Sequence, residues 1–380
     1  MATAAAEDRR AEVDRKVERV AALARNSGLA GIVITTQHNF AWLTAGRTNR
    51  IDSSREVGTA SVLVSAHGRR CVLASTIEAP RTSEETVAGL GFELVEFPWT
   101  EDRADPGHMF RLAEQAIGGG PLGADTATPH AQPVEGGLAK LRATLDRDEL
   151  PRYRNLGDVV GRTLGELVRS TLPGASENDV ARAVSAALLT LDIRPVVLLV
   201  AADRRIASYR HPTPTNLRWT RRLLVAVCAE YEGLIVGASR IVSARADDDL
   251  QKRTRATAQV CAALFESTKA GATGRDLFAA AASAYAAAGY PGEERLHHQG
   301  GAIAYRSREW VAHPHSTDIV TPTQAFAWNP TVTGTKIEET CVLHEDDRLE
   351  IVTASPGWPA TEITARGQRL FLPDVFILGA

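Results

Sequence analysis

The chain has 380 residues, a length that favours two domains, each long enough to bury its own core. Hydrophobic residues make up 44% of the chain and charged residues 23%, as in ordinary globular proteins, and a net charge of −3 argues against nucleic-acid binding. The four cysteines form no CxxC pair, which argues against a disulfide framework and a zinc finger. A reducing, cytoplasmic location is therefore expected.

The first 28 residues are rich in charge and carry Val13, Val17 and Val20 at helical spacing, so they predict an amphipathic helix rather than a signal peptide. No apolar run approaches the roughly 20 residues that span a bilayer, so no membrane partner is expected. Strands alternate with helices after this first helix, and residues 1–150 are predicted to form an α/β domain. The predicted strands are 29–36, 58–65 and 69–75, and the predicted helices are 76–91 and 105–120.

Residues 151–380 are predicted to form a second domain, which makes the chain α+β overall. A helix with one apolar face is expected to end at Pro173-Gly174, and Ser176 and Asp179 form a capping-box pattern for the next helix. Residues 244–289 are alanine-rich and predict two further helices. The predicted strands of this domain are 194–202, 221–242, 324–332, 336–343 and 347–353.

Generic catalytic motifs, such as a phosphate loop, a GxSxG elbow or an HExxH helix, are absent from the sequence. Candidate site residues come instead from polar clusters in or between the predicted strands. His211 stands in the turn RHPTPTN, where its imidazole is accessible to a substrate; an exposed turn histidine without a role is the alternative. The segment HHQGGAIAYRSREWVAHPH is either a binding loop or a histidine-rich surface loop. Its candidates are His297, Tyr305, Arg308 and Glu309.

Two further candidates lie on neighbouring strand-like arms, FAWNPTV and KIEET. Asn329 cannot ionise and is a poor ligand for a hard metal ion, but it donates and accepts hydrogen bonds. Glu338 and Glu339 alternate in direction along an extended segment, so one of the two is expected to face inward. An exposed strand glutamate is the alternative for either residue.

Taken in order, these clusters resemble the creatinase/prolidase/aminopeptidase P family, which has the pita-bread fold. GLAGIVITTQHNFAWLTAG is similar to the start of a creatinase-type N-terminal domain, and KIEETCVLHEDDRLEIVT is similar to the closing hairpin of the pita-bread domain. The resemblance covers nearly the whole chain. It implies a creatinase-type N-terminal α/β domain followed by a C-terminal pita-bread domain.

Peptidases of this family bind two metal ions through two Asp, one His and two Glu residues. In this sequence, the two Asp positions fall on Ala226 and Gly237, and the His position falls on Gly301. The first Glu position falls on Asn329, and the second is kept as Glu338. One carboxylate cannot build a two-metal site, so no bound metal and no other cofactor is expected.

The resemblance to the metal-free enzymes creatinase and ectoine hydrolase implies a metal-independent hydrolase that cleaves a carbon–nitrogen bond in an amidine, guanidine, cyclic amidine or amide. His211 is then the general acid/base, and Glu338, with a pKa raised by the loss of metal cations, activates water or binds a cationic group. Arg308 replaces the positive charge of the metal and holds a substrate carboxylate. His297, Tyr305 and Asn329 complete the hydrogen-bonding shell.

Three other functions remain open: a metal-free lyase or isomerase, a non-catalytic binding protein and, last, an Xaa-Pro metallopeptidase. Family members of this length also imply a homodimer in which the N-terminal domain of one subunit closes the partner's site. On that pattern Arg50 and Arg55, in the loop GRTNRIDSSREVG, contact the substrate of the partner; simple solvation of the loop is the alternative.

Overall fold

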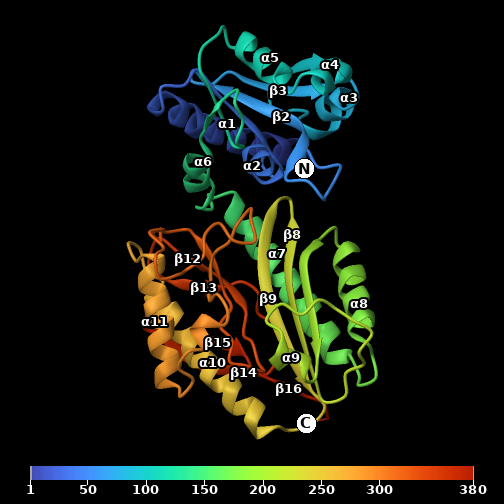
Figure 1. Cartoon of the computed structure of the whole chain (residues 1–380), viewed down its shortest axis with the longest axis vertical. Helices are drawn as coiled ribbons and strands as arrows, with labels where there is room; N and C mark the ends of the chain where they lie inside the picture. Colours follow the sequence, from blue (N-terminus) through green and yellow to red (C-terminus); the bar gives the residue numbers. More distant parts are fainter. Residues whose placement is uncertain (1, 380) are drawn as a thin grey trace. The chain divides into compact units, whose positions relative to one another are not determined.

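A computed structural model describes residues 2–379 of the chain, which divides into two compact units (Figure 1). The first unit ends at Arg142 and the second begins at Ala143, whereas the sequence placed the boundary between residues 150 and 151. The boundary lies earlier because Leu145 is buried and its backbone N–H donates to Thr323 O at 2.9 Å, within the second unit. Across the described residues, no helix combines the length and the apolar content needed to cross a membrane.

The first unit is built on a six-stranded mixed sheet with the order β4-β3-β2-β1-β5-β6. Helix α1 buries Val13, Val17 and Val20, as their spacing predicts. The expected helix at 76–91 is only the short helix α3 and a π-helical turn at Thr82–Thr86. The helices and strands of this unit are α1 (Ala2–Asn26), β1 (Gly31–Thr36), α2 (Gln37–Leu43), β2 (Val57–Ser65), β3 (Arg70–Ser75), α3 (Ala79–Arg81), β4 (Glu93–Phe97), α4 (Trp99–Ala104), α5 (His108–Ala116), β5 (Leu122–Ala124), β6 (Gln132–Pro133) and α6 (Glu135–Arg142).

The second unit contains two four-stranded sheets, ordered β16-β9-β8-β7 and β10-β11-β12-β13, and the hairpin β14-β15. Figure 1 shows α7 and α8 beside the first sheet and α10 and α11 beside the C-terminal strands. The elements are α7 (Glu149–Ser170), α8 (Glu177–Leu189), β7 (Arg194–Ala202), α9 (Arg205–Ser208), β8 (Arg222–Tyr231), β9 (Leu234–Ser243), α10 (Asp248–Ser267), α11 (Gly274–Ala287), β10 (Gly300–Ala302), β11 (Ala325–Trp328), β12 (Glu339–Leu343), β13 (Leu349–Ile351), β14 (Ala360–Ala365), β15 (Gln368–Pro373) and β16 (Phe376–Ile377).

Local sequence explains where several of these elements begin. Helix α8 starts at the predicted capping box, in which the Ser176 and Asp179 side chains each accept from the other's backbone N–H. A second box, of Thr273 and Asp276, starts α11. The two helices predicted within residues 244–289 are therefore α10 and α11, and the break between them lies between Ser267 and Gly274. Strand β11 is shorter than predicted, because regular pairing ends at Trp328, just before the Asn329-Pro330 pair.

Three glycines, spaced four residues apart on α7, bring the helix close to the chain segment 352–355. A Cβ atom on Gly157 would lie 2.4 Å from Val352 O, and one on Gly161 would lie 2.4 Å from Thr353 O. Gly165 faces Ser355 in the same way. Any larger residue at these positions would push the segment 352–355 away from α7. The three glycines therefore determine where the chain that follows β13 can lie.

Candidate active site

The C-terminal unit contains a cavity of about 320 Å³ whose walls come from β7, β8 and four loops. One wall is apolar and is formed by Val197, Leu199, Ala226 and Val227. The other wall is polar. It consists of His211, His298, Ser307, Arg308, Asn329, Lys336 and Glu338. The cavity therefore offers a small ligand an apolar side and a charged side.

Strand register explains the apolar wall. Ala226 pairs with Leu199 on β7 and with Ser239 on β9, and paired residues in a sheet direct their side chains to the same face. Cys228, two residues on, also lines the cavity and pairs with Gly237. Ala226 and Gly237, the two positions aligned with the Asp ligands of the family, therefore lie on one face of the sheet but supply no polar atom.

Glu338 lies at the centre of the charged wall, in an extended segment docked onto β9. Its backbone N–H donates to Ser239 Oγ at 2.8 Å, and Ser239 N–H donates back to Glu338 O at 3.0 Å. Arg308 Nη2 lies 3.0 Å from Glu338 Oε1, and Lys336 Nζ lies 3.2 Å from Oε2. All three side chains are buried or nearly so, which leaves one net positive charge in the cavity.

The pKa of Glu338 is lowered, not raised as the sequence predicted. Burial alone would raise the pKa of this carboxyl, but the ammonium of Lys336 and the guanidinium of Arg308 outweigh it. A carboxylate whose two oxygens each hold a cation is a weak proton acceptor. Glu338 is therefore placed to hold Lys336 and Arg308, and not to serve as a general base.

Glu339 points away from the cavity, as the alternation along the segment predicted. Its carboxylate pairs with Arg240 at 2.6 Å, and both side chains are 1% exposed. Arg240 also donates to Thr353 O and to Ser355 Oγ. Neither residue of this buried pair lines the cavity.

His211 and His297 form a hydrogen bond between their Nε2 atoms at 3.0 Å. The loop that carries His211 is fixed by Arg210, which donates to Glu293 Oε2 and to Thr331 Oγ1. His298 stacks on His297, with ring centroids 4.4 Å apart. His211 and His298 line the cavity, and His297 contacts both of their rings.

All three imidazoles are held neutral by their surroundings. Burial and then Lys336 lower the pKa of His211, and burial lowers the pKa of His297 more strongly. Burial followed by Arg308 lowers the pKa of His298 to about 4. Each ring therefore has an unprotonated nitrogen near neutral pH, and in the His211–His297 bond one ring donates and the other accepts.

Several buried polar atoms at the site have no hydrogen-bond partner among the described residues. They include Asn329 Oδ1, Arg308 Nε and the Nδ1 atoms of His297 and His298. Asn329 is 2% exposed and lines the cavity, and its backbone N–H is fixed by Gln299 O at 3.0 Å. Buried polar atoms are normally satisfied, so these atoms indicate a place for a polar ligand.

The residues present do not fit the two-metal site of the related peptidases. At Gly301, a Cβ atom would lie 2.0 Å from Trp310 O, so no side chain of any kind fits there. At Gly237, a Cβ atom would lie 2.9 Å from Glu338 Oε1, because that carboxylate fills the space. Ala226 has no donor atom, and Glu338 is already paired with two cations. Four of the five ligand positions therefore cannot bind a metal ion strongly.

A different metal site is also disfavoured by charge. Ligand atoms of His211, His297 and His298 lie within 4.8 Å of one another, close enough to share one metal ion. Lys336 and Arg308 act electrostatically on the same rings, and their positive charges oppose a dication. The net charge of the cavity favours an anion at this place.

Several sequence candidates lie outside the cavity lining. Tyr305 is 2% exposed and its hydroxyl donates to Glu149 Oε1 at 2.6 Å, so its expected role in the hydrogen-bonding shell is replaced by a structural one. Glu309 Oε1 accepts from the backbone N–H of Tyr305 and stabilises the loop. Arg50 and Arg55 belong to the N-terminal unit, and their contact with a partner's substrate stays a prediction.

Lys336 is the functional residue that the sequence reading missed. It stands two residues before Glu338, and alternate residues of an extended segment face the same side. Once Glu338 was expected to face inward, the same alternation could have placed Lys336 beside it. Cys228 was also missed; burial raises the pKa of its thiol to about 11, so it is a neutral part of the wall.

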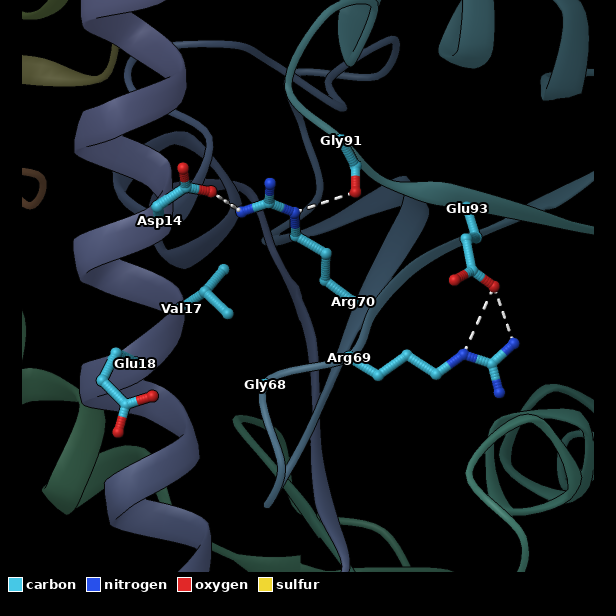
Figure 2. A pocket seen from close by; sticks show the side chains of 8 residues that line it. All are labelled: Asp14, Val17, Glu18, Gly68, Arg69, Arg70, Gly91 and Glu93. Carbon is cyan, nitrogen blue, oxygen red and sulfur yellow. Dashed lines mark hydrogen bonds and ion pairs between the residues drawn. The ribbon is translucent and has the colours of Figure 1, made fainter.

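The N-terminal unit has a depression of about 370 Å³ with charged walls (Figure 2). Figure 2 shows Arg70 reaching Asp14, at 2.6 Å, and the carbonyl oxygen of Gly91. Arg69 pairs with Glu93 at 2.7 Å. Because these charges satisfy one another, the depression offers a ligand less than the cavity of the C-terminal unit does.

Comparisons with known proteins agree with this fold. A protein described as "Probable dipeptidase PepE" from Mycobacterium bovis is 24% identical over 362 residues, which cover 89% of this chain and 93% of that protein. The crystal structure of dipeptidase PepE from Mycobacterium ulcerans superposes with a TM-score of 0.75 at 19% identity, covering 91% of this chain and 97% of that one. The N-terminal domain of FACT complex subunit SPT16 from chickpea superposes with a TM-score of 0.71 at 13% identity, covering 91% and 96%.

The model of metallopeptidase family M24 matches residues 151–348, which is more than half of the chain. The matched segment contains the whole polar wall of the cavity and the four positions to which the resemblance assigns metal ligands that are missing from this sequence. The expectation of a creatinase- and prolidase-like fold is thereby confirmed. The chain belongs to metallopeptidase family M24.

Proposed function

We propose that this chain is a metal-independent hydrolase that cleaves a carbon–nitrogen bond of a small molecule, and that the bond is an amide. The observation that carries the proposal is that His211, which lines one cavity together with Lys336 and Arg308, is hydrogen-bonded to His297. His211 supplies proton transfer, and the two cations supply positive charge. In the related peptidases the metal ions serve both purposes, because they activate a water and polarise the bond under attack.

The charge of the cavity favours an amide over an amidine or a guanidine. Amidines and guanidines are cations at neutral pH, and the cavity already carries one unbalanced positive charge. An amide is neutral, and its carbonyl oxygen becomes negative when water adds to it. Lys336 and Arg308 attract that developing charge.

The imidazole pair provides a route for the proton. With the Nε2 atoms of His211 and His297 joined, Nδ1 of His211 is the nitrogen left for a reactant. When His211 donates through Nε2, its Nδ1 is unprotonated and accepts a proton from water. His211 is then an imidazolium whose Nε2–H stays hydrogen-bonded to His297, and its Nδ1–H protonates the leaving nitrogen, which returns the ring to its neutral form. One water is consumed, the carbon–nitrogen bond breaks, and an acid and an amine are released.

Of the two cations, Lys336 is better placed to act on the reacting carbonyl group. Its charge lowers the pKa of both His211 and His297 more than the charge of Arg308 does, so it acts most strongly on the proton-transfer pair. An ammonium held there stabilises the oxyanion formed by water addition. Glu338 is a positioning residue, because it holds the ammonium and the guanidinium through its two oxygens.

A second candidate is the hydrolysis of dipeptides, which the similarity to the mycobacterial dipeptidases favours. It also breaks an amide bond, but in the related peptidases it depends on metal. A third candidate is a non-catalytic role within a protein complex, since the similar chickpea SPT16 domain belongs to a subunit of the FACT complex. Both candidates are separated from the proposal by one experiment.

Purified protein is analysed for Mn, Co and Zn, dialysed against a chelator, and incubated with N-acyl amino acids, cyclic amides and dipeptides while amine release is followed. The proposal expects turnover that survives chelation and falls at least a hundredfold in His211→Asn and in His297→Phe. Turnover that appears only with two equivalents of metal supports the dipeptidase. Turnover that is unchanged in both histidine variants overturns the assignment of the imidazole pair.

A further inference from the structure

The net charge of the cavity wall indicates which charge a ligand should have. Arg308, Lys336 and Glu338 are the charged side chains among the described residues that line it, and they sum to one positive charge. The side chains of Lys336 and Glu338 are at most 5% exposed, and that of Arg308 is 15% exposed. An unbalanced charge that is largely shielded from water has an unfavourable solvation free energy. A ligand with one carboxylate would neutralise this charge.

The same wall has no place for an ammonium group. Glu338 is its one acidic side chain among the described lining residues, and each of its oxygens already holds a cation. A ligand ammonium would have to compete with Lys336 or Arg308 for this carboxylate. A zwitterion would leave the charge of the cavity unbalanced, whereas a ligand with an acylated nitrogen would not.

Two unsatisfied atoms indicate where the groups of such a ligand would bind. Arg308 Nε is a buried donor without a partner, and a carboxylate beside it would accept that hydrogen bond. Asn329 Oδ1 is a buried acceptor without a partner, on a side chain that is 2% exposed, and an amide N–H would donate to it. The apolar wall of Val197, Leu199 and Ala226 is free to contact an alkyl group.

We propose, on the basis of the function proposed above, that the cavity takes a small N-acylated amino acid with a free carboxylate and no free ammonium group. Arg308 binds the carboxylate, Asn329 accepts from the amide N–H, and Lys336 faces the amide carbonyl group. The volume, about 320 Å³, lies at the lower end for small-molecule sites, about 300–1,000 Å³, and suits a ligand of this size. Dipeptides with a free N-terminus are disfavoured by the same charges.

Three matched compounds test this ligand class. N-acetyl-L-leucine has the carboxylate and the acylated nitrogen, N-acetyl-L-leucinamide lacks the carboxylate charge, and glycyl-L-leucine adds an ammonium group to the acetyl carbon. Binding is measured by calorimetry at low salt on His211→Asn, so that the ligand is not consumed. We expect N-acetyl-L-leucine to bind at least tenfold more tightly than either of the other two.

Arg308→Met should reduce the preference for the acid over its amide to less than twofold, while Arg308→Lys should keep a part of it. The exposed Arg275, changed to Met, is the matched control and should leave the preference unchanged. Arg308→Lys also serves as the variant to measure if Arg308→Met does not fold. Equal binding of the acid and the amide, equal binding of glycyl-L-leucine, or no binding of any of the three at millimolar concentration would overturn the proposal.

The binding result and the turnover result separate the two proposals. If N-acetyl-L-leucine binds with the expected preference but wild-type protein releases no amine from N-acyl amino acids, the ligand class stands and the hydrolase proposal fails. If neutral amides are hydrolysed as well as their acids are, the hydrolase proposal stands and the ligand class fails.

Discussion

Lys336 and Glu338 stand two residues apart in the sequence, and the ammonium of one lies 3.2 Å from Oε2 of the other inside the cavity. Arg308 holds the opposite oxygen at 3.0 Å, so a single carboxylate balances part of the charge of two cations. The arrangement makes Glu338 important for stability as well as for the position of both cations.

We predict that Glu338→Gln destabilises the protein by about 3–5 kcal/mol, because it leaves two buried cations without a counter-charge. Urea unfolding at pH 7.5 measures the loss. The double variant Glu338→Gln/Lys336→Met has the same net charge in the cavity as the wild type and should recover part of the lost free energy. A double variant that is as unstable as the sum of the two single variants would show that the residues do not interact.

We predict that Lys336→Met lowers kcat by about 10²–10³-fold on an N-acyl substrate, with a smaller effect on KM, since the ammonium acts on charge that develops after binding. Arg308→Met should instead raise KM, because its partner is a group present in the bound substrate. The exposed Lys269, changed to Met, is a control for the loss of a lysine and should leave both constants unchanged. If Lys336→Met raises KM and leaves kcat unchanged, Lys336 takes no part in the chemical step.

The neutral imidazoles predict a loss of stability in mild acid. His298 has its pKa lowered to about 4 by burial and then Arg308, whereas in the unfolded chain it titrates near 6.5, so between these values the unfolded state binds the extra proton. Stability present above about pH 6.5 should therefore fall as the pH falls, by at most about 1.4 kcal/mol per pH unit for this group. The lowered pKa values of His211 and His297 act in the same direction.

Urea unfolding between pH 7.5 and 4.5 measures this slope, and His298→Asn should make it shallower by removing one titrating group. Glu338 contributes at lower pH. Because its pKa is lowered, its stabilisation is present above about pH 4.3 and is lost as the pH falls further. An unchanged slope in His298→Asn would contradict the assignment of a neutral, buried imidazole.

Gly301→His is predicted to restore no metal binding and to destabilise the fold, because its Cβ would lie 2.0 Å from Trp310 O. Metal content after incubation with Mn, Co or Zn, together with the thermal melting temperature, measures both effects. Gly136→Ala is the matched control: no atom lies within 4 Å of its added Cβ, and Ala favours the helix in which it stands. A stable Gly301→His protein that binds two equivalents of metal would contradict the prediction.

The sequence predicted the elements that depend on local signals. The capping box at Ser176 and the helix α7 follow from residue type and spacing over a few positions, whereas the segment 221–242, predicted as one strand, folds as the two strands β8 and β9. The resemblance also named most polar residues of the cavity, among them His211, Arg308 and Glu338. These three positions come from separate segments, and only family alignment, not periodicity, could bring them together.

What the sequence did not predict depends on packing between distant segments. The direction of the pKa shift of Glu338 is set by the side chain of Lys336 and by that of Arg308, which lies 30 residues earlier in the chain. Tyr305 is directed to Glu149, 156 residues away in the chain, so its structural role had no local signal. The three glycines spaced along α7 likewise have no local explanation, because the segment that they contact, residues 352–355, is distant in the sequence.

The close approach of the Trp310 carbonyl group to Gly301 has an evolutionary consequence. A single substitution cannot return a histidine ligand to position 301 unless the backbone around Trp310 also moves, and a larger residue at position 237 would displace the carboxylate of Glu338. Positions 301 and 237 are therefore coupled to the backbone near Trp310 and to Glu338, so that building a two-metal site here requires concerted substitutions instead of single ones.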